Sequence, residues 1–317
     1  MKSRRLFIKS VSAFSAAVVL TGTRNLYADE VKPESTVVSE RKIHLFSKHL
    51  HWLGYAEMAK TAKNIGFDGI DLTVRPDGHV LPENVNTDLP EAVDEIRKNG
   101  LIIDRITTAI VDPDDPLTIP ILQKASELGI KNYRMGWLKY DPAFSVKENL
   151  KLVNSKLERL ARLNKQFKIR GAYQNHASEW VGGAVWDMGI MLEGIDPEYL
   201  GIRYDIRHAT VEGGLSWPVT MDFLADKINS LDLKDFIWKE IENKWQPINV
   251  PLGEGMVDFE RFLKILKQLN IAADFTMHFE YELGGADTGA HKLTVPPEVV
   301  LTAMKLDLST LKGWLQL

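Results

Sequence analysis

The feature that most constrains the fold is a regular alternation of short strand-like runs with longer helical periods, which continues from residue 42 to the end of the 317-residue chain. Strands are predicted at 42–47, 69–75, 101–107, 132–137, 171–176, 201–205, 230–235 and 275–281. Helices are predicted near 55–66, 90–99, 117–129, 145–166, 185–194, 218–227, 257–269 and 297–313. This alternation predicts an α/β protein whose parallel strands are joined by helical crossovers.

The number of units favours a closed barrel. Eight strand-then-helix units in about 250 residues are typical of a (β/α)8 TIM barrel, so we predict one such domain over 42–317. A doubly wound open sheet is the main alternative. No GxGxxG or GxxxxGK[ST] motif follows a predicted strand, which removes the usual nucleotide signature of that alternative.

The first 28 residues have the pattern of an export signal. A basic start precedes an apolar run at 11–20 that is too short to span a bilayer comfortably, and Leu26-Tyr27-Ala28 fits an A-x-A-like cleavage site. The run S-R-R-L-F-I-K resembles a twin-arginine signal, which implies a periplasmic or otherwise exported protein that folds before translocation. A basic amphipathic helix or membrane anchor is the alternative. Residues 29–41 are polar and contain proline, which indicates a linker.

Composition excludes several classes of chemistry. The chain has no cysteine, which excludes disulfides, thiolate metal ligands, thiol nucleophiles and lipidated cysteine anchors. Its formal net charge is −4, and the leader holds five basic and no acidic residues, so its removal would leave −9. This balance argues against a nucleic-acid-binding surface.

Strand periodicity predicts which side chains face the barrel axis. Alternate residues of a barrel strand point inward, and the outward residues of the predicted strands are apolar. The inward sets are polar at the carboxyl ends of five strands: Asp71, Thr73 and Arg75; Gln174 and His176; Arg203 and Asp205; Ser230, Asp232 and Lys234; Thr276, His278 and Glu280. Because a barrel places its active site at this end, we expect a charged site there.

The gathered carboxylates, amide and imidazoles suit a divalent cation. Oxygen and imidazole ligands without thiolates favour Mn²⁺, Mg²⁺ or Co²⁺, with Zn²⁺ also compatible. The alternative is a set of structural ion pairs without metal, such as Arg203 with Asp205 and Lys234 with Asp235.

Motifs at the ends of these strands resemble the xylose isomerase-like barrels, the sugar phosphate isomerase/epimerase superfamily. They are Y-Q-N-H at 173–176, Y-D-I-R-H at 204–208, L-K-D at 233–235, P-L-G-E-G-M-V-D-F at 251–259 and H-F-E-Y-E at 278–282. The resemblance extends from Ile43 to about Leu311. In the epimerases of this superfamily, Glu, Asp, His and Glu from the fifth to eighth strands hold a metal. Matching motifs place these roles on Gln174, Asp205, Asp232 and Glu280.

Two of the four positions depart from the family pattern. Glutamate is replaced by Gln174 and histidine by Asp232, so the set keeps three carboxylates. An amide cannot act as a general base, which puts simple two-carboxylate epimerisation in doubt. His176 shares the face of Gln174 and is an alternative ligand of the fifth strand.

Other residues are candidates for catalysis and binding. His208 matches the histidine of the family's D-x-x-H motif and is predicted to act as a base or to hydrogen-bond an oxyanion; the alternative is orienting Asp205. Lys234 is expected to stabilise developing negative charge, and His176 is the third catalytic candidate. Substrate contacts are predicted at Arg75, His79, Arg134 and His278.

The resemblance implies an enzyme that acts on a small-molecule carbohydrate. The first hypothesis is a metal-dependent isomerase or epimerase that removes a proton next to a sugar carbonyl and forms an enediolate. The second is a lyase or hydrolase that cleaves oxidised (3-keto) glycosides by β-elimination, and the third is a non-catalytic sugar-binding barrel. We expect no nucleic-acid partner and no stable membrane anchor. The sequence is compatible with a homo-oligomer.

Overall fold

Eight parallel strands close into a barrel in the computed structural model, which describes residues 41–316. The order around the barrel is β1-β10-β7-β6-β5-β4-β3-β2. The strands are β1 (Ile43–Phe46), β2 (Gly69–Val74), β3 (Ile102–Thr108), β4 (Asn132–Arg134), β5 (Arg170–Gln174), β6 (Leu200–Asp205), β7 (Ile228–Leu233) and β10 (Phe275–Met277). All eight lie within or beside the predicted ranges, so the TIM barrel prediction is confirmed.

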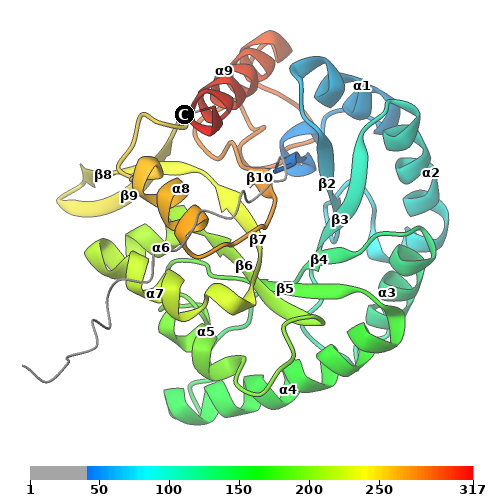
Figure 1. Cartoon of the computed structure of the whole chain (residues 1–317). Helices are drawn as coiled ribbons and strands as arrows, with labels where there is room; N and C mark the ends of the chain where they lie inside the picture. Colours follow the sequence, from blue (N-terminus) through cyan, green and yellow to red (C-terminus); the bar gives the residue numbers. More distant parts are fainter. Residues whose placement is uncertain (1–40, 317) are drawn as a thin grey trace, which may run out of the picture. The chain divides into compact units, whose positions relative to one another are not determined.

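Helices follow the strands and form the outer layer of the barrel (Figure 1). They are α1 (Tyr55–Ile65), α2 (Val85–Lys98), α3 (Thr118–Glu127), α4 (Val146–Phe167), α5 (Trp186–Met191), α6 (Ile206–Gly213), α7 (Trp217–Phe223), α8 (Phe259–Gln268) and α9 (Pro297–Leu315). Short 3-10 helices are η1 (Ser47–Leu50), η2 (Pro82–Asn84), η3 (Gly214–Ser216) and η4 (Ala225–Lys227). Each helix predicted from the sequence has a counterpart here.

Three local details differ from the prediction. α2 begins at Val85 instead of near residue 90, because Val85 and Leu89 pack into the core. α6 starts directly at the end of β6, so His208 lies in the first turn of a helix and not in a loop. A two-stranded antiparallel hairpin, β8 (Asp235–Ile241) and β9 (Lys244–Val250), follows β7 and extends away from the barrel (Figure 1).

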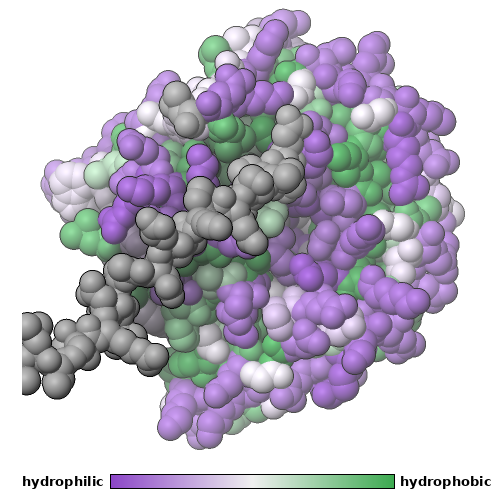
Figure 2. Space-filling model, viewed as in Figure 1, coloured by the Kyte–Doolittle hydropathy of each residue, from purple (hydrophilic) through white to green (hydrophobic). Residues whose placement is uncertain are grey.

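Apolar side chains lie between the barrel and the helices. Outward residues of the strands, such as Leu45, Ile70 and Phe275, are fully buried against this outer layer. In α4, the residues buried against the barrel include Leu150, Leu157 and Leu160. Hydrophilic residues cover much of the face shown in Figure 2. Buried charged residues, in contrast, come from the inward positions of the barrel strands, among them Asp71, Arg203 and Asp232.

The export signal predicted at 1–28 and nearly all of the linker predicted at 29–41 lie outside the described residues. Among residues 41–316, no helix is both long and apolar enough to cross a membrane.

Candidate functional site

A small cavity opens at the carboxyl ends of the barrel strands. Its volume is about 200 Å³. Seven residues predicted for the site line it: Arg75, Arg134, Gln174, His176, Lys234, His278 and Glu280. Four further lining residues were not in the predicted set: Phe46, Lys48, Trp137 and Thr288. Sequence signals existed for two of these, since Lys48 directly follows the first predicted strand and Trp137 ends the fourth.

The other four predicted residues do not line the cavity. Asp205 and Asp232 are completely buried beneath it. His79 lies beside Ser47, where its ring nitrogens are 3.1 Å from the Ser47 hydroxyl and 3.2 Å from the Leu50 carbonyl. His208 packs against the ring of His176, with ring centroids 4.2 Å apart.

Arg203 is the central cation beneath the cavity. Its Nε lies 2.6 Å from each carboxylate oxygen of Asp232, and its Nη1 donates to Asp71. Burial would raise the pKa of Asp232, but Arg203 and His278 together hold that pKa well below its ordinary value. Arg203 faces inward as the strand period predicts, yet its partners are Asp71 and Asp232, not Asp205.

Lys234 joins two carboxylates at the edge of the cavity. Its ammonium nitrogen is 3.1 Å from Asp205 and 2.8 Å from Glu280. Burial opposes the charge of Lys234, but attraction to these carboxylates outweighs it and raises the lysine pKa. Glu280 also accepts a hydrogen bond of 2.8 Å from Lys48. Although burial would raise it, these two lysines keep the pKa of Glu280 well below its ordinary value, so Glu280 is ionised at neutral pH.

The four predicted metal ligands come close together, but their arrangement does not fit a divalent cation. Gln174 directs its amide N–H groups at Asp205 (2.9 Å) and Asp232 (2.7 Å), while its carbonyl oxygen accepts from Arg134. Arg203 occupies both oxygens of Asp232. Within residues 41–316 no group of three or more histidine or acidic side chains is placed to hold a metal ion.

Charge counting agrees with this geometry. To bind these carboxylates, a divalent cation would have to displace the side-chain cations that already hold them. The site already holds five cationic side chains against four carboxylates: Lys48, Arg75, Arg134, Arg203 and Lys234 against Asp71, Asp205, Asp232 and Glu280. The side-chain cations neutralise the carboxylates here.

His176 is the cavity residue best suited to accept a proton. Its Nδ1 lies 2.9 Å from the Ala177 carbonyl, which can only accept, so Nδ1 carries the hydrogen and Nε2 has the lone pair. Burial and the charge of Lys234 lower the pKa of His176 to about 4. The imidazole is therefore neutral at pH 7 and available as a base.

His208 has the opposite tautomer. Its Nδ1 accepts a hydrogen bond from Arg207 at 3.1 Å, which places the hydrogen on Nε2, 3.6 Å from Asp205. Burial lowers the pKa of His208 well below its ordinary value. This geometry agrees with the alternative considered from the sequence, in which His208 orients Asp205.

The spacing of the Y-D-I-R-H motif has a local cause. Asp205 ends β6 and caps α6, since its side chain accepts from the backbone N–H of His208 at 3.0 Å. Asn175 links β5 to β6 through hydrogen bonds with both backbone groups of Asp205. The cap and this link fix the carboxylate against Lys234.

The P-L-G-E-G-M-V-D-F motif also has a structural explanation. The Asp235 carboxylate accepts backbone N–H groups from Gly253, Gly255 and Val257, at 3.0 to 3.1 Å. A Cβ atom at Gly255 would overlap this carboxylate. The motif therefore forms a loop around Asp235, directly after Lys234, and holds the end of β7 in place.

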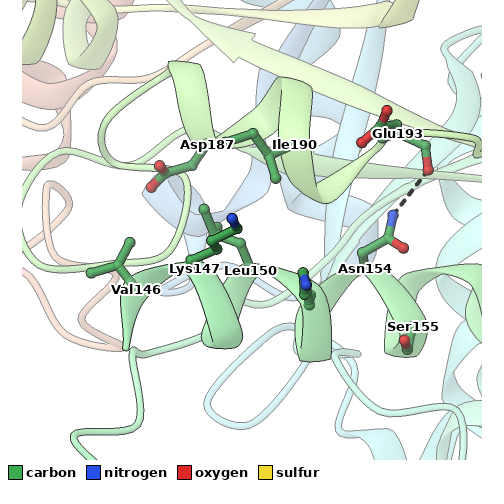
Figure 3. A pocket seen from close by; sticks show the side chains of 9 residues that line it. Val146, Lys147, Leu150, Asn154, Ser155, Asp187, Ile190 and Glu193 are labelled. Carbon is green, nitrogen blue, oxygen red and sulfur yellow. Dashed lines mark hydrogen bonds between the residues drawn. The ribbon is translucent and has the colours of Figure 1, made fainter. Parts of the chain in front are cut away.

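A larger cavity of about 810 Å³ lies elsewhere, between α4 and α5 (Figure 3). Its walls include Val146, Leu150 and Ile190, and Asn154 hydrogen-bonds the backbone of Glu193 across it. None of the predicted site residues lines this cavity, so its size does not make it the catalytic candidate.

A closed parallel barrel with charged residues at the carboxyl ends of its strands defines a TIM barrel with the usual location of an active site. The model of the family described as "Xylose isomerase-like TIM barrel" matches residues 59–295, and the chain belongs to this family. The superfamily expected from the motifs is thus confirmed.

Solved structures share the fold at low sequence identity. A 3-keto-D-glucoside 4-epimerase from E. coli, in its apo form, has a TM-score of 0.64 and 14% identity, with 86% of this chain and 100% of that chain covered. The IOLI protein with a bound zinc atom has a TM-score of 0.67 and 14% identity, covering 86% and 99%. A xylose isomerase-like TIM barrel protein from Mycobacterium smegmatis, in complex with magnesium, has a TM-score of 0.61 and 15% identity, covering 86% and 99%. No protein with a curated description matches the sequence significantly.

Proposed function

We propose that this protein is a carbohydrate isomerase or epimerase-type enzyme that removes a proton next to a sugar carbonyl. Membership of the xylose isomerase-like family and the similarity in fold to a 3-keto-D-glucoside 4-epimerase support this class. The single observation that carries the proposal is the cavity in which a neutral histidine with a free lone pair, His176, and a buried ammonium, Lys234, both face the same small volume.

His176 is the proposed general base. Its Nδ1–H is held by the Ala177 carbonyl, so Nε2 is the atom that takes the proton from the carbon next to the carbonyl. Proton removal moves negative charge onto the carbonyl oxygen and produces an enediolate. For isomerisation, His176 returns the proton to the former carbonyl carbon while the proton of the neighbouring hydroxyl moves to the former carbonyl oxygen. For epimerisation, a second proton donor such as a water molecule protonates the original carbon from its opposite face, and His176 later releases its proton to solvent.

Lys234 is the proposed stabiliser of the enediolate oxygen. An ammonium group has three N–H donors, and the two carboxylates Asp205 and Glu280 account for two of them. The third is available to a substrate oxygen. Because the ammonium is held by two fixed carboxylates, little reorganisation is needed when charge develops. Glu280, ionised between Lys48 and Lys234, is available to accept a hydrogen bond from a sugar hydroxyl.

None of these steps uses a metal ion, because the predicted ligands are arranged around side-chain cations and do not fit one. The divalent cation predicted from the sequence stays a prediction, which metal analysis of the purified protein tests. The export predicted from residues 1–28 is likewise a proposal, and it favours free or oxidised sugars as substrates over phosphorylated ones.

Isotope exchange tests the proposed chemistry. The wild-type protein is incubated in D₂O with a panel of ketoses and keto-sugar acids, and deuterium at the carbon next to the carbonyl is followed by NMR. Replacing the base by His176→Gln is expected to slow exchange by about 100-fold or more. His291→Gln is the matched control, because His291 is an exposed histidine outside the cavity.

The other outcomes separate the alternatives. Cleavage of a 3-keto glycoside, with release of its leaving group, would replace the isomerase proposal by the lyase. Binding of a sugar without exchange or cleavage would contradict both and support a sugar-binding barrel. Unchanged exchange in the His176→Gln variant would refute the assignment of the base.

A further inference from the structure

The cavity contains a buried arginine that has no acidic partner among the residues that the structure describes. Arg134 is only 3% exposed, and within the described part of the chain its guanidinium donates one hydrogen bond, to the side-chain carbonyl oxygen of Gln174 at 3.2 Å. Its Nε is buried and has no acceptor among residues 41–316. Its guanidinium lies over the ring of Trp137, 4.3 Å from the centroid. Among residues 41–316 no carboxylate lies within ion-pair distance of Arg134.

Burying a charge without a countercharge is costly. The nearby Arg203 shows how this chain satisfies a buried arginine that has a purely internal role, because it holds both Asp71 and Asp232. Those two carboxylates are therefore already paired and do not neutralise Arg134. Glu280 in turn is held by Lys48 and Lys234. Every acidic group of the site is bound by another cation, which leaves Arg134 without one.

Two further cavity groups share this lack of acceptors. Arg75 lines the cavity and lies over the ring of Phe46, at 5.6 Å, with no carboxylate in ion-pair range in the described part of the chain. The indole Nε1 of Trp137 is buried and finds no acceptor within the described residues. Burial and the positive charges of Arg75 and Arg203 lower the pKa of Arg134 to about 9, as expected for cations gathered together.

The charges of the cavity walls therefore do not balance. Lys48, Arg75, Arg134 and Lys234 are cationic, and Glu280 is the one acidic residue among the lining side chains of the described chain. The volume of about 200 Å³ is smaller than the 300–1,000 Å³ typical of drug-sized ligands, which indicates a ligand about the size of a monosaccharide.

We propose that the substrate of this site is an acidic monosaccharide, whose carboxylate or phosphate is bound by Arg134 with Arg75. The inference rests on the proposed carbohydrate chemistry and narrows its substrate class. Guanidinium groups bind planar anions through paired N–H donors, so the unused donors of Arg134 and Arg75 suit this task. His176 and Lys234, on other walls of the same cavity, then face the carbons and oxygens of the bound sugar.

Binding measurements test this proposal without requiring turnover. Affinity is measured by calorimetry, at constant ionic strength, for D-glucuronate, D-galacturonate, D-gluconate and glucose 6-phosphate, and for the neutral D-glucose and D-galactose. We expect at least one acidic sugar to bind 10-fold or more tightly than its neutral counterpart. Preference for the carboxylates or for the phosphate identifies the anion. Equal affinity for acidic and neutral sugars, or binding of none of the acids, overturns the proposal.

Two variants locate the anion. Arg134→Gln is expected to lose at least 10-fold in affinity for the acidic sugar, while its melting temperature without ligand stays equal to that of the wild type or rises, because an unpaired buried charge is removed. Arg170→Gln removes the same charge at the start of β5, outside the cavity, and is expected to leave affinity unchanged. A lower melting temperature of Arg134→Gln with unchanged affinity would assign Arg134 a structural role and refute the inference.

Failure of this proposal is distinguishable from failure of the proposed enzyme. Tight binding of an acidic sugar without proton exchange would support the anion site and refute the isomerase proposal. Proton exchange with neutral ketoses alone, and no affinity for acidic sugars, would support the isomerase and refute the anion site.

Discussion

Replacing Arg203 by methionine is the sharpest test of how the barrel interior is held together. Arg203 is 2% exposed and binds Asp71 and Asp232, both of which are completely buried. Methionine fills a similar volume but has no charge. The substitution therefore leaves two carboxylates in the barrel without their shared cation.

The expected loss of stability is large. Removing one partner of a buried ion pair costs about 3–5 kcal/mol, and here one substitution unpairs two carboxylates. Since the total free energy of unfolding of a domain is about 5–15 kcal/mol, a large part of the stability would be lost. The melting temperature should fall by roughly 5–15 °C for a domain of this size.

Urea denaturation, followed by circular dichroism, measures this loss. Arg159→Met is the control, because Arg159 forms an exposed ion pair with Asp114 that should contribute less than about 1 kcal/mol. If Arg203→Met does not fold, the triple variant with Asp71→Asn and Asp232→Asn should restore a folded barrel, since the unpaired charges are gone. A loss below about 1 kcal/mol for Arg203→Met would refute the argument that this cation neutralises the barrel interior.

Four further predictions concern other parts of the chain. Burial lowers the pKa of His51 to about 4 and of His79 to about 3, so the unfolded chain takes up protons below about pH 6.5 that the folded chain does not. Their contribution to the free energy of unfolding is thus complete above that pH. As pH falls toward 4, the free energy of unfolding should decrease by up to about 1 kcal/mol per histidine and pH unit, which denaturation at several pH values measures. Gly255→Ala should destabilise the protein by about 1–3 kcal/mol, because its Cβ displaces the loop from Asp235; a neutral effect would contradict the proposed loop role. Removing metal with a chelator should leave the melting temperature unchanged, since side-chain cations hold the carboxylates, whereas a drop of several degrees would restore the sequence-based metal prediction. Fused to a reporter protein, residues 1–28 should direct export, and replacing their paired arginines by lysines should stop it; export that persists would contradict the twin-arginine assignment.

Much of the fold could be predicted because hydrophobic periodicity is a local property. The alternation of strands and helices, the barrel and the inward faces of the strands follow from periods of 2 and 3.6 residues. The contacts of Gln174, Arg203 and Glu280 confirm the inward faces. The hairpin β8–β9 was missed, because its residues lie outside the repeating pattern of strands and helices. In the structure, Glu242 and Asn243 at its tip have the positive φ of a tight turn.

The sequence placed most of the site at one end of the barrel, but it could not determine the partners of the charges. Asp71 and Arg203 are 132 positions apart in the chain, and only closure of the barrel brings them together. Lys234 was considered as an ion-pair partner of Asp235, whereas in the structure it contacts both Asp205 and Glu280. Such pairing depends on distances of a few ångströms across the barrel, which no local period encodes.

By itself, then, the sequence determined the barrel, the family and the set of polar residues at its mouth, because alternation along each strand decides which side chains face the axis. Only the tertiary structure decided that Arg203 and Lys234 neutralise the carboxylates and that, within residues 41–316, Arg134 has no acidic partner. The physical reason is that buried charges must be compensated in three dimensions, and the nearest countercharge to each residue comes from a different strand.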